Sequence, residues 1–167
     1  MAPVIVLALI CLVISGALAF TNSITEPVIA SAAAERERAA RYEIIPGADS
    51  FEIMDISGLP STVKEAYRST NDVGYIILIT ASGYGGDMKV ICGIDPDGKL
   101  IHSKALEQAE TKGLGSRITD APFIEQFEGR DSRLEGVAAI TGATISSQAY
   151  INAIADAFAA FEIIRGH

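Results

Sequence analysis

The sequence predicts an α+β protein, with a single N-terminal transmembrane helix followed by an antiparallel-sheet domain with flanking helices. Three observations predict it: no Lys, Arg, Asp or Glu precedes Glu26, the middle of the chain alternates short apolar runs with strong turns, and the C-terminal end repeats apolar residues at helical spacing. Hairpin strands with helices outside them are typical of α+β domains. With 167 residues, of which 49% are hydrophobic, the chain has room for one such domain besides its apolar start.

The apolar start is the segment Pro3–Phe20, which as a helix can cross roughly 30 Å of hydrocarbon. A cleaved signal peptide is the alternative, because Ala17-Leu18-Ala19 resembles a cleavage site. The apolar run is longer than a usual signal-peptide core, and no positive charge precedes it. Both facts favour a retained single-pass anchor in the cell membrane.

We expect three regions along the chain. Residues 1–24 form the transmembrane helix, residues 25–45 form a helical stalk rich in Ala, Glu and Arg, and residues 46–167 form the folded domain. The stalk would begin at Thr25-Glu26-Pro27, because proline is tolerated in the first turn of a helix.

The net charge of −8 lies wholly after the anchor, and this acidic charge argues against nucleic acid as a partner of the domain. The arginines of the stalk, Arg36, Arg38 and Arg41, point weakly to a cytoplasmic domain by the positive-inside tendency. They alternate with Glu35 and Glu37, so the sequence alone does not decide the orientation.

Strong turns divide the middle of the chain into strands. In the segment 88–94, alternate residues are apolar and define one buried face: Met88, Val90, Cys92 and Ile94. The turns Gly83-Tyr84-Gly85-Gly86 and Asp95-Pro96-Asp97-Gly98 flank this strand. The predicted strands cover residues 51–55, 75–79, 88–94 and 99–106.

Three helices are expected around these strands. Thr62-x-x-Glu65 matches a capping box and predicts a short helix through Arg68. Asp120-Ala121-Pro122 opens another short helix, with Asp as the cap. A final helix ends near Ile164, and its apolar stripe consists of Ile151, Ile154, Phe158 and Phe161.

The start of the final helix is the strongest candidate for a ligand site. The segment Ile140–Ser147 contains Gly142, where the backbone can come close to a ligand, and three hydroxyls, those of Thr144, Ser146 and Ser147. The first N–H groups of a helix have no internal partner and carry the positive end of the helix dipole, so they favour a phosphate. An ordinary helix cap explains the same residues, since Ser and Thr are preferred there without any ligand.

The rest of the domain offers little chemistry of its own. No histidine stands in a catalytic context beside a nucleophile, and the two cysteines, Cys11 and Cys92, form no metal motif. Glu107 and Glu110 fall in a polar, glycine-containing loop, where carboxylates are usually solvated. We therefore predict no catalytic residues and no metal, and any redox chemistry would come from a bound cofactor.

Together, the motifs resemble a known family across nearly the whole chain. The apolar helix, Gly83–Gly86, Asp95–Lys99, Glu110–Gly115 and Thr141–Ser147 occur in the order typical of the FMN-binding G subunits of the Rnf complex. Their relatives are the C subunits of the sodium-pumping NADH:quinone reductase. Four separated motifs in order are far more specific than any one of them.

The resemblance implies a covalent FMN. In this family a flavin transferase attaches FMN through a phosphoester to the last threonine of the tetrad, here Thr144. It implies that other residues surround the cofactor: Thr141, Gly142, Ala143, Ser146 and Ser147 near the phosphate, and Glu110, Thr111, Gly113, Leu114 and Gly115 near the flavin. The chain departs from the family pattern at Lys112, where proline is usual, and at Ala138, where the transferase motif usually has Asp.

The function that the resemblance implies is that of an electron relay. The chain would be one component of a membrane-bound, ion-translocating ferredoxin:NAD oxidoreductase, with its FMN domain on the extracytoplasmic side and other redox and membrane subunits as partners. Two alternatives stay open: the quinone-reductase C subunit, and a membrane-anchored flavin-binding sensor without electron-transfer partners.

Overall fold

The computed structural model describes residues 2–166, which divide into two compact units, one ending at Arg38 and the other beginning at Ala39. Helix α1, Ala2–Ile44, runs through the first unit and ends in the second. Its apolar part is long and hydrophobic enough to cross a membrane. The helix start expected at Thr25 is wrong, since α1 continues through Pro27. Proline costs the helix one backbone hydrogen bond, and long helical segments on both sides outweigh that loss here.

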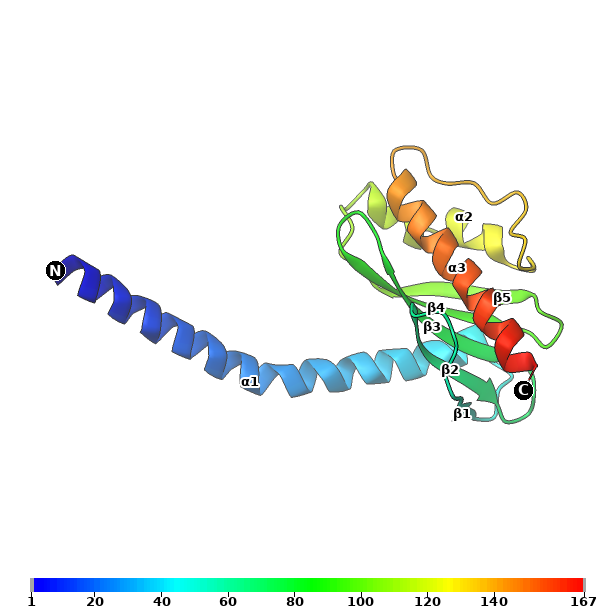
Figure 1. The fold of residues 1–167 in the computed structure, drawn as a ribbon, viewed down its shortest axis with the longest axis horizontal. Coiled ribbons are helices and arrows are strands. Elements are labelled where there is room, and N and C mark those ends of the chain that lie inside the picture. Colours follow the sequence, from blue (N-terminus) through cyan, green and yellow to red (C-terminus); the bar gives the residue numbers. More distant parts are fainter. Residues whose placement is uncertain (1, 167) are drawn as a thin grey trace. The chain divides into compact units, whose positions relative to one another are not determined.

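The second unit contains an antiparallel sheet whose strands follow one another in chain order (Figure 1). Each strand pairs with the next, so the sheet is a simple meander. The strands are β1, Phe51–Ile53; β2, Val63–Ser69; β3, Tyr75–Ser82; β4, Asp87–Ile94; and β5, Leu100–Glu107. This confirms the predicted α+β class, and four of the five strands lie where the sequence predicted them.

Strand β2 corrects the helix expected after Thr62. The segment pairs with β3, the most apolar strand, and with β1 on its other side. Val63, Ala66 and Ser69 turn inward from it. Thr62 does not cap a helix: its hydroxyl donates to Asp156 of the last helix at 2.7 Å. Strand pairing across the sheet therefore overrides the local helix signal.

Short helices and a long loop connect β5 to the last helix. The short helices are η1, Gly115–Thr119; α2, Ala121–Ile124; and η2, Glu125–Phe127. Asp120 precedes α2 as predicted, although its side chain makes no capping hydrogen bond. After the loop, α3, Thr144–Arg165, crosses one face of the sheet, as the apolar stripe predicted (Figure 1).

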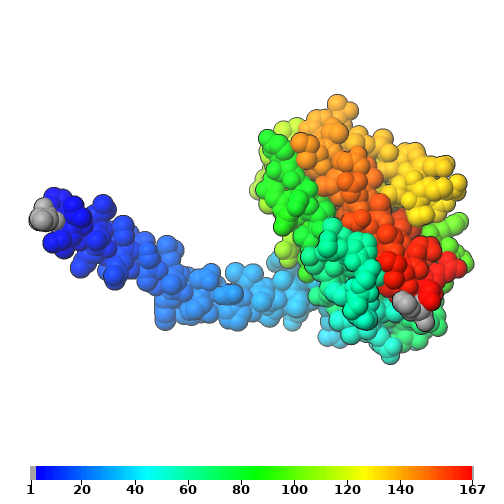
Figure 2. All heavy atoms as spheres, viewed as in Figure 1, coloured from blue at the N-terminus to red at the C-terminus, as the bar shows by residue number. Residues whose placement is uncertain are grey.

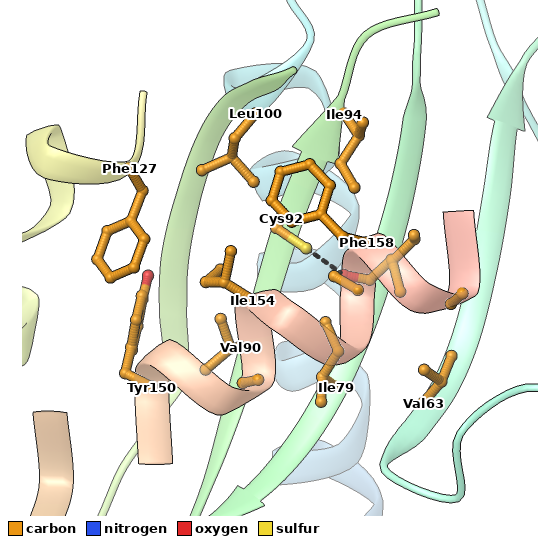
Figure 3. Packing of buried hydrophobic residues seen from close by; sticks show 14 of the residues in the cluster. Val63, Ile79, Val90, Cys92, Ile94, Leu100, Phe127, Tyr150, Ile154 and Phe158 are labelled. Carbon is orange, nitrogen blue, oxygen red and sulfur yellow. Dashed lines mark hydrogen bonds between the residues drawn. The ribbon is translucent and has the colours of Figure 1, made fainter. Parts of the chain in front are cut away.

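The main core lies between α3 and that face of the sheet. The predicted inward face of β4 is confirmed, because its four apolar residues all belong to this core. Figure 3 shows Ile154 and Phe158 of α3 over Val90, Cys92 and Ile94. Burial makes the Cys92 thiol inert, since desolvation raises its pKa above the ordinary range.

A smaller core covers the opposite face of the sheet. The last turn of α1 contributes Ala40 and Ile44, which pack with Ile76, Leu78 and Ile91. Gly93 of β4 lies directly under Ile44, so a side chain there would collide with the helix. Both faces of the sheet are thus covered, and the edges and hairpin ends of the domain are left to form sites.

Candidate functional site

A pocket with a volume of about 420 Å³ lies at the N-terminal end of α3 in the second unit. Three segments far apart in the sequence line it: the β3–β4 turn, the loop after β5 and the first turn of α3. Figure 2 shows two of them side by side, the green hairpin tip and the orange start of α3. The lining residues are Tyr84, Glu110, Thr111, Leu114, Gly115, Gly142, Ala143, Thr144, Ile145 and Ser146.

Most of the residues predicted from the sequence lie in this pocket, and three do not line it. Gly113 is exposed in the loop at φ +79°. Ser147 is buried beneath the turn, and Thr141 lines a second hollow of about 330 Å³ with Ala138 and Arg117. The roles of all the predicted residues in cofactor binding stay predictions.

The three hydroxyls at the start of α3 have different partners. Ser147 Oγ donates to the Ala143 carbonyl at 2.8 Å and accepts from the Ile140 N–H at 3.1 Å, so it holds the turn together from inside. Ser146 Oγ donates to Glu110 Oε2 at 2.7 Å. Thr144 is exposed, and its hydroxyl makes no hydrogen bond with the described part of the chain. Of the three hydroxyls, only that of Thr144 is exposed to solvent at the pocket.

The turn before α3 gives that hydroxyl its position. Gly142 has φ +85°, a left-handed conformation that glycine adopts without strain, and it turns the chain into the helix. The N-cap residue is Ala143, whose side chain cannot cap the helix. The N–H groups of the first turn therefore keep their capacity for an outside acceptor such as phosphate.

Apolar side chains surround the hydroxyl-rich first turn of α3. Tyr84, Leu114 and Ile145 line the pocket and are 72%, 52% and 59% exposed, respectively. Large apolar side chains that cluster in one exposed hollow usually indicate a binding site. A flat aromatic ligand would cover these three side chains. Leu114 lies against the turn of α3, since a Cβ on Gly142 would be 3.8 Å from its Cδ2.

Sequence reasoning missed Tyr84 and Ile145 as lining residues. For Tyr84 a signal was available, because an aromatic residue between glycines in a tight turn has no core to pack into. Ile145 lies outside the apolar stripe of α3, which could have marked it as facing a ligand rather than the sheet.

Glu110 also differs from expectation. It is 7% exposed, whereas Glu107 at the end of β5 is exposed as predicted. The carboxylate of Glu110 accepts hydrogen bonds from the β3–β4 turn and from α3, so the interpretation of a solvated carboxylate is wrong for this residue. Loop composition alone could not predict donors that arrive from distant segments.

An exposed hydroxyl at a helix start, with apolar and aromatic groups around it, suits a ligand that combines a phosphate with an aromatic ring. The FMN-binding domain family matches residues 83–159, which include all three segments of the pocket. The second unit thus contains an FMN-binding domain.

Similar proteins identify the family more narrowly. The G subunit of an ion-translocating oxidoreductase complex from Methanosarcina acetivorans is 32% identical, over 90% of this chain and 88% of the relative. The G subunit of the Na⁺-translocating ferredoxin:NAD⁺ oxidoreductase complex of Acetobacterium woodii is 29% identical, over 90% and 86%. The proton-translocating counterpart of Clostridium ljungdahlii is 26% identical, over 90% and 85%. The chain belongs to this family of G subunits, which confirms the resemblance seen in the motifs.

Proposed function

We propose that this chain is the electron-transfer G subunit of an ion-translocating ferredoxin:NAD oxidoreductase and carries FMN covalently on Thr144. Helix α1 anchors it in the membrane, and the FMN-binding domain relays electrons between other subunits of the complex. It contributes a bound carrier to the redox-driven translocase and has no catalytic activity alone. Family membership and the FMN-binding domain support the relay role.

The main support for covalent attachment is the hydroxyl of Thr144, the first residue of α3, which has no hydrogen-bond partner in the described part of the chain. Its neighbours Ser146 and Ser147 are committed to hydrogen bonds inside the protein, whereas Thr144 is exposed on the pocket. A phosphate esterified there lies beside the unpaired N–H groups of the helix. This contact between helix dipole and anion contributes roughly 0.3–2 kcal/mol.

The pocket residues fit FMN as well as its phosphate. Tyr84, Leu114 and Ile145 offer apolar surface to a flat ring system, and backbone groups of the loop at Thr111–Gly115 offer polar contacts at its edge. FMN, when bound, supplies the capacity to accept and donate single electrons. The protein holds it, limits its contact with water and, through the ester, keeps it from dissociating.

Two further parts of the proposal follow from the family resemblance. A separate flavin transferase makes the phosphoester, and the FMN domain lies on the extracytoplasmic side of the membrane. Ala138, where the family usually has Asp, is exposed near Thr141 at the second hollow. The rest of the tetrad is intact, so we expect the transferase to act on this chain.

The covalent claim is tested on the full chain, produced with an active flavin transferase and purified in detergent. The intact mass should exceed the polypeptide mass by one FMN less one water, because in the phosphoester the threonine oxygen, without its proton, replaces one hydroxyl group of the FMN phosphate. Flavin fluorescence should also stay with the band in a denaturing gel. Thr144→Ala should lose both signals completely, since no other hydroxyl takes its place at the start of α3.

Thr119→Ala is the matched control, because Thr119 is also an exposed threonine of this domain and lines neither of the two hollows. It should keep the added mass. A wild-type chain without the added mass, or fluorescence that survives Thr144→Ala, refutes covalent attachment at this residue.

A further inference from the structure

The carboxylate of Glu110 joins the three segments of the pocket. Its Oε1 accepts the N–H of Tyr84 at 2.8 Å and that of Gly85 at 3.3 Å, both from the β3–β4 turn. Its Oε2 accepts the hydroxyl of Ser146 from α3 at 2.7 Å. A buried carboxylate needs such donors, and here each donor comes from a segment that lines the pocket.

The glycines of two sequence motifs make room for this carboxylate. A Cβ on Gly83 would collide with Oε1 of Glu110, and a Cβ on Gly115 would collide with Oε2. A Cβ on Gly85 would collide with the backbone carbonyl of Ala109. The β3–β4 turn and the loop after β5 therefore form one packed unit around Glu110.

Tyr84 is the residue that this unit presents to the pocket. Its backbone N–H donates to Glu110, yet its side chain is 72% exposed and lines the pocket together with the first turn of α3. The aromatic ring buries little surface in the protein itself. Its position is therefore set by the backbone that Glu110 holds, and a flat ligand in the pocket would meet the ring.

We propose that Tyr84 forms an aromatic wall of the flavin site and that Glu110 is the positioning residue that holds this wall in place. The inference rests on the proposed FMN site and adds two roles to it. Glu110 acts through the β3–β4 turn and Ser146, because its two oxygens are already occupied by protein donors. Tyr84 contacts the flavin and shields it from water.

Amide hydrogen exchange on the full chain in detergent tests the positioning role without any need for bound flavin. Glu110→Ala removes the acceptor, and exchange at the N–H groups of Tyr84 and Gly85 should accelerate at least about tenfold. Glu110→Gln should restore most of the protection, since its amide oxygen can accept from the turn while its NH₂ group donates to Ser146 Oγ. Glu125→Ala, at an exposed glutamate of η2, is the matched control and should leave these amides unchanged.

Unchanged exchange at both amides in Glu110→Ala overturns the positioning role. Should that variant unfold throughout, Tyr84 itself decides the proposal. In the FMN-loaded chain, Tyr84→Ala should raise the quenching of flavin fluorescence by iodide roughly twofold, whereas Tyr84→Phe keeps the ring and the shielding. Equal quenching in the wild type and Tyr84→Ala overturns the aromatic wall.

The two proposals fail in different ways. An intact mass that lacks FMN refutes the covalent site, while the exchange experiment still reports on Glu110 in the flavin-free chain. A chain that carries FMN but shows neither effect refutes the inference about Tyr84 and Glu110 alone.

Discussion

The two glycine-containing turns at opposite ends of β4 are stabilised in different ways. In the β4–β5 turn, Asp95 accepts the N–H of Gly98 on its carbonyl at 3.0 Å and that of Lys99 on its carboxylate at 2.8 Å. In the β3–β4 turn, Gly83 donates to the Gly86 carbonyl, but the two central N–H groups reach across to Glu110. One turn closes on itself, and the other needs a partner from a distant segment.

This difference separates two uses of glycine. Gly98 has φ +81°, so the turn needs glycine for its backbone conformation. Gly83 needs no unusual backbone angle, and glycine is required there because the Glu110 carboxylate and Met88 lie where a side chain would be. A turn that is closed by its own hydrogen bonds contributes only to the fold. A turn that is held by a distant segment can form a binding site together with that segment.

Among the substitutions in the two turns, Gly83→Ala should have the largest effect on stability and on FMN incorporation. The added methyl would collide with Glu110 and lie 2.7 Å from the Met88 methyl, which overpacks the site and costs about 1–3 kcal/mol of unfolding free energy. Because the collision displaces the carboxylate that holds the turn, FMN incorporation should also fall. Denaturant unfolding and the intact-mass measurement report the two effects.

Gly98→Ala is the matched control at the other turn. It strains the left-handed backbone by about 1–2 kcal/mol but leaves the pocket untouched, so FMN incorporation should equal that of the wild type. Equal incorporation in Gly83→Ala and the wild type would contradict the idea that the β3–β4 turn belongs to the site.

The same contrast explains how much could be predicted from the sequence. Asp95-Pro96-Asp97-Gly98 contains all the groups that close the turn, so the hairpin and its two strands were predictable from local chemistry. The inward face of β4 and the stripe of α3 were predictable too, because periodicity reports which side of an element is buried.

Structural features that depend on contacts with distant segments could not be predicted from the local sequence pattern. The segment after Thr62 is a strand because β1 and β3 provide hydrogen bonds on both sides, which no capping motif reveals. Glu110 is buried because donors reach it from the β3–β4 turn and α3. The four motifs were recognised together as a family signature, but only the three-dimensional structure shows that three of them, Gly83–Gly86, Glu110–Gly115 and Thr141–Ser147, meet at this carboxylate.

Asp95→Ala should have an intermediate effect confined to stability. It removes the carboxylate that accepts the Lys99 N–H, and a hydrogen bond of this kind contributes about 0.5–1.5 kcal/mol. The domain should lose that much unfolding free energy, measured by denaturant titration, and keep its full FMN content. A loss of FMN in this variant would show that the β4–β5 turn influences the site after all.

Gly98→Asn should have the smallest effect of the series. Asparagine adopts left-handed backbone angles more readily than other residues with a side chain, so it should cost less than Gly98→Ala, under about 1 kcal/mol. A Cβ at this position lies 3.3 Å from Phe161 Cε1, a close contact that a small shift of the ring can relieve. If Asn proves as costly as Ala in denaturant unfolding, the contact with Phe161, and not the backbone angle, is the reason for glycine. The β4–β5 turn would then resemble the β3–β4 turn in using glycine for close approach.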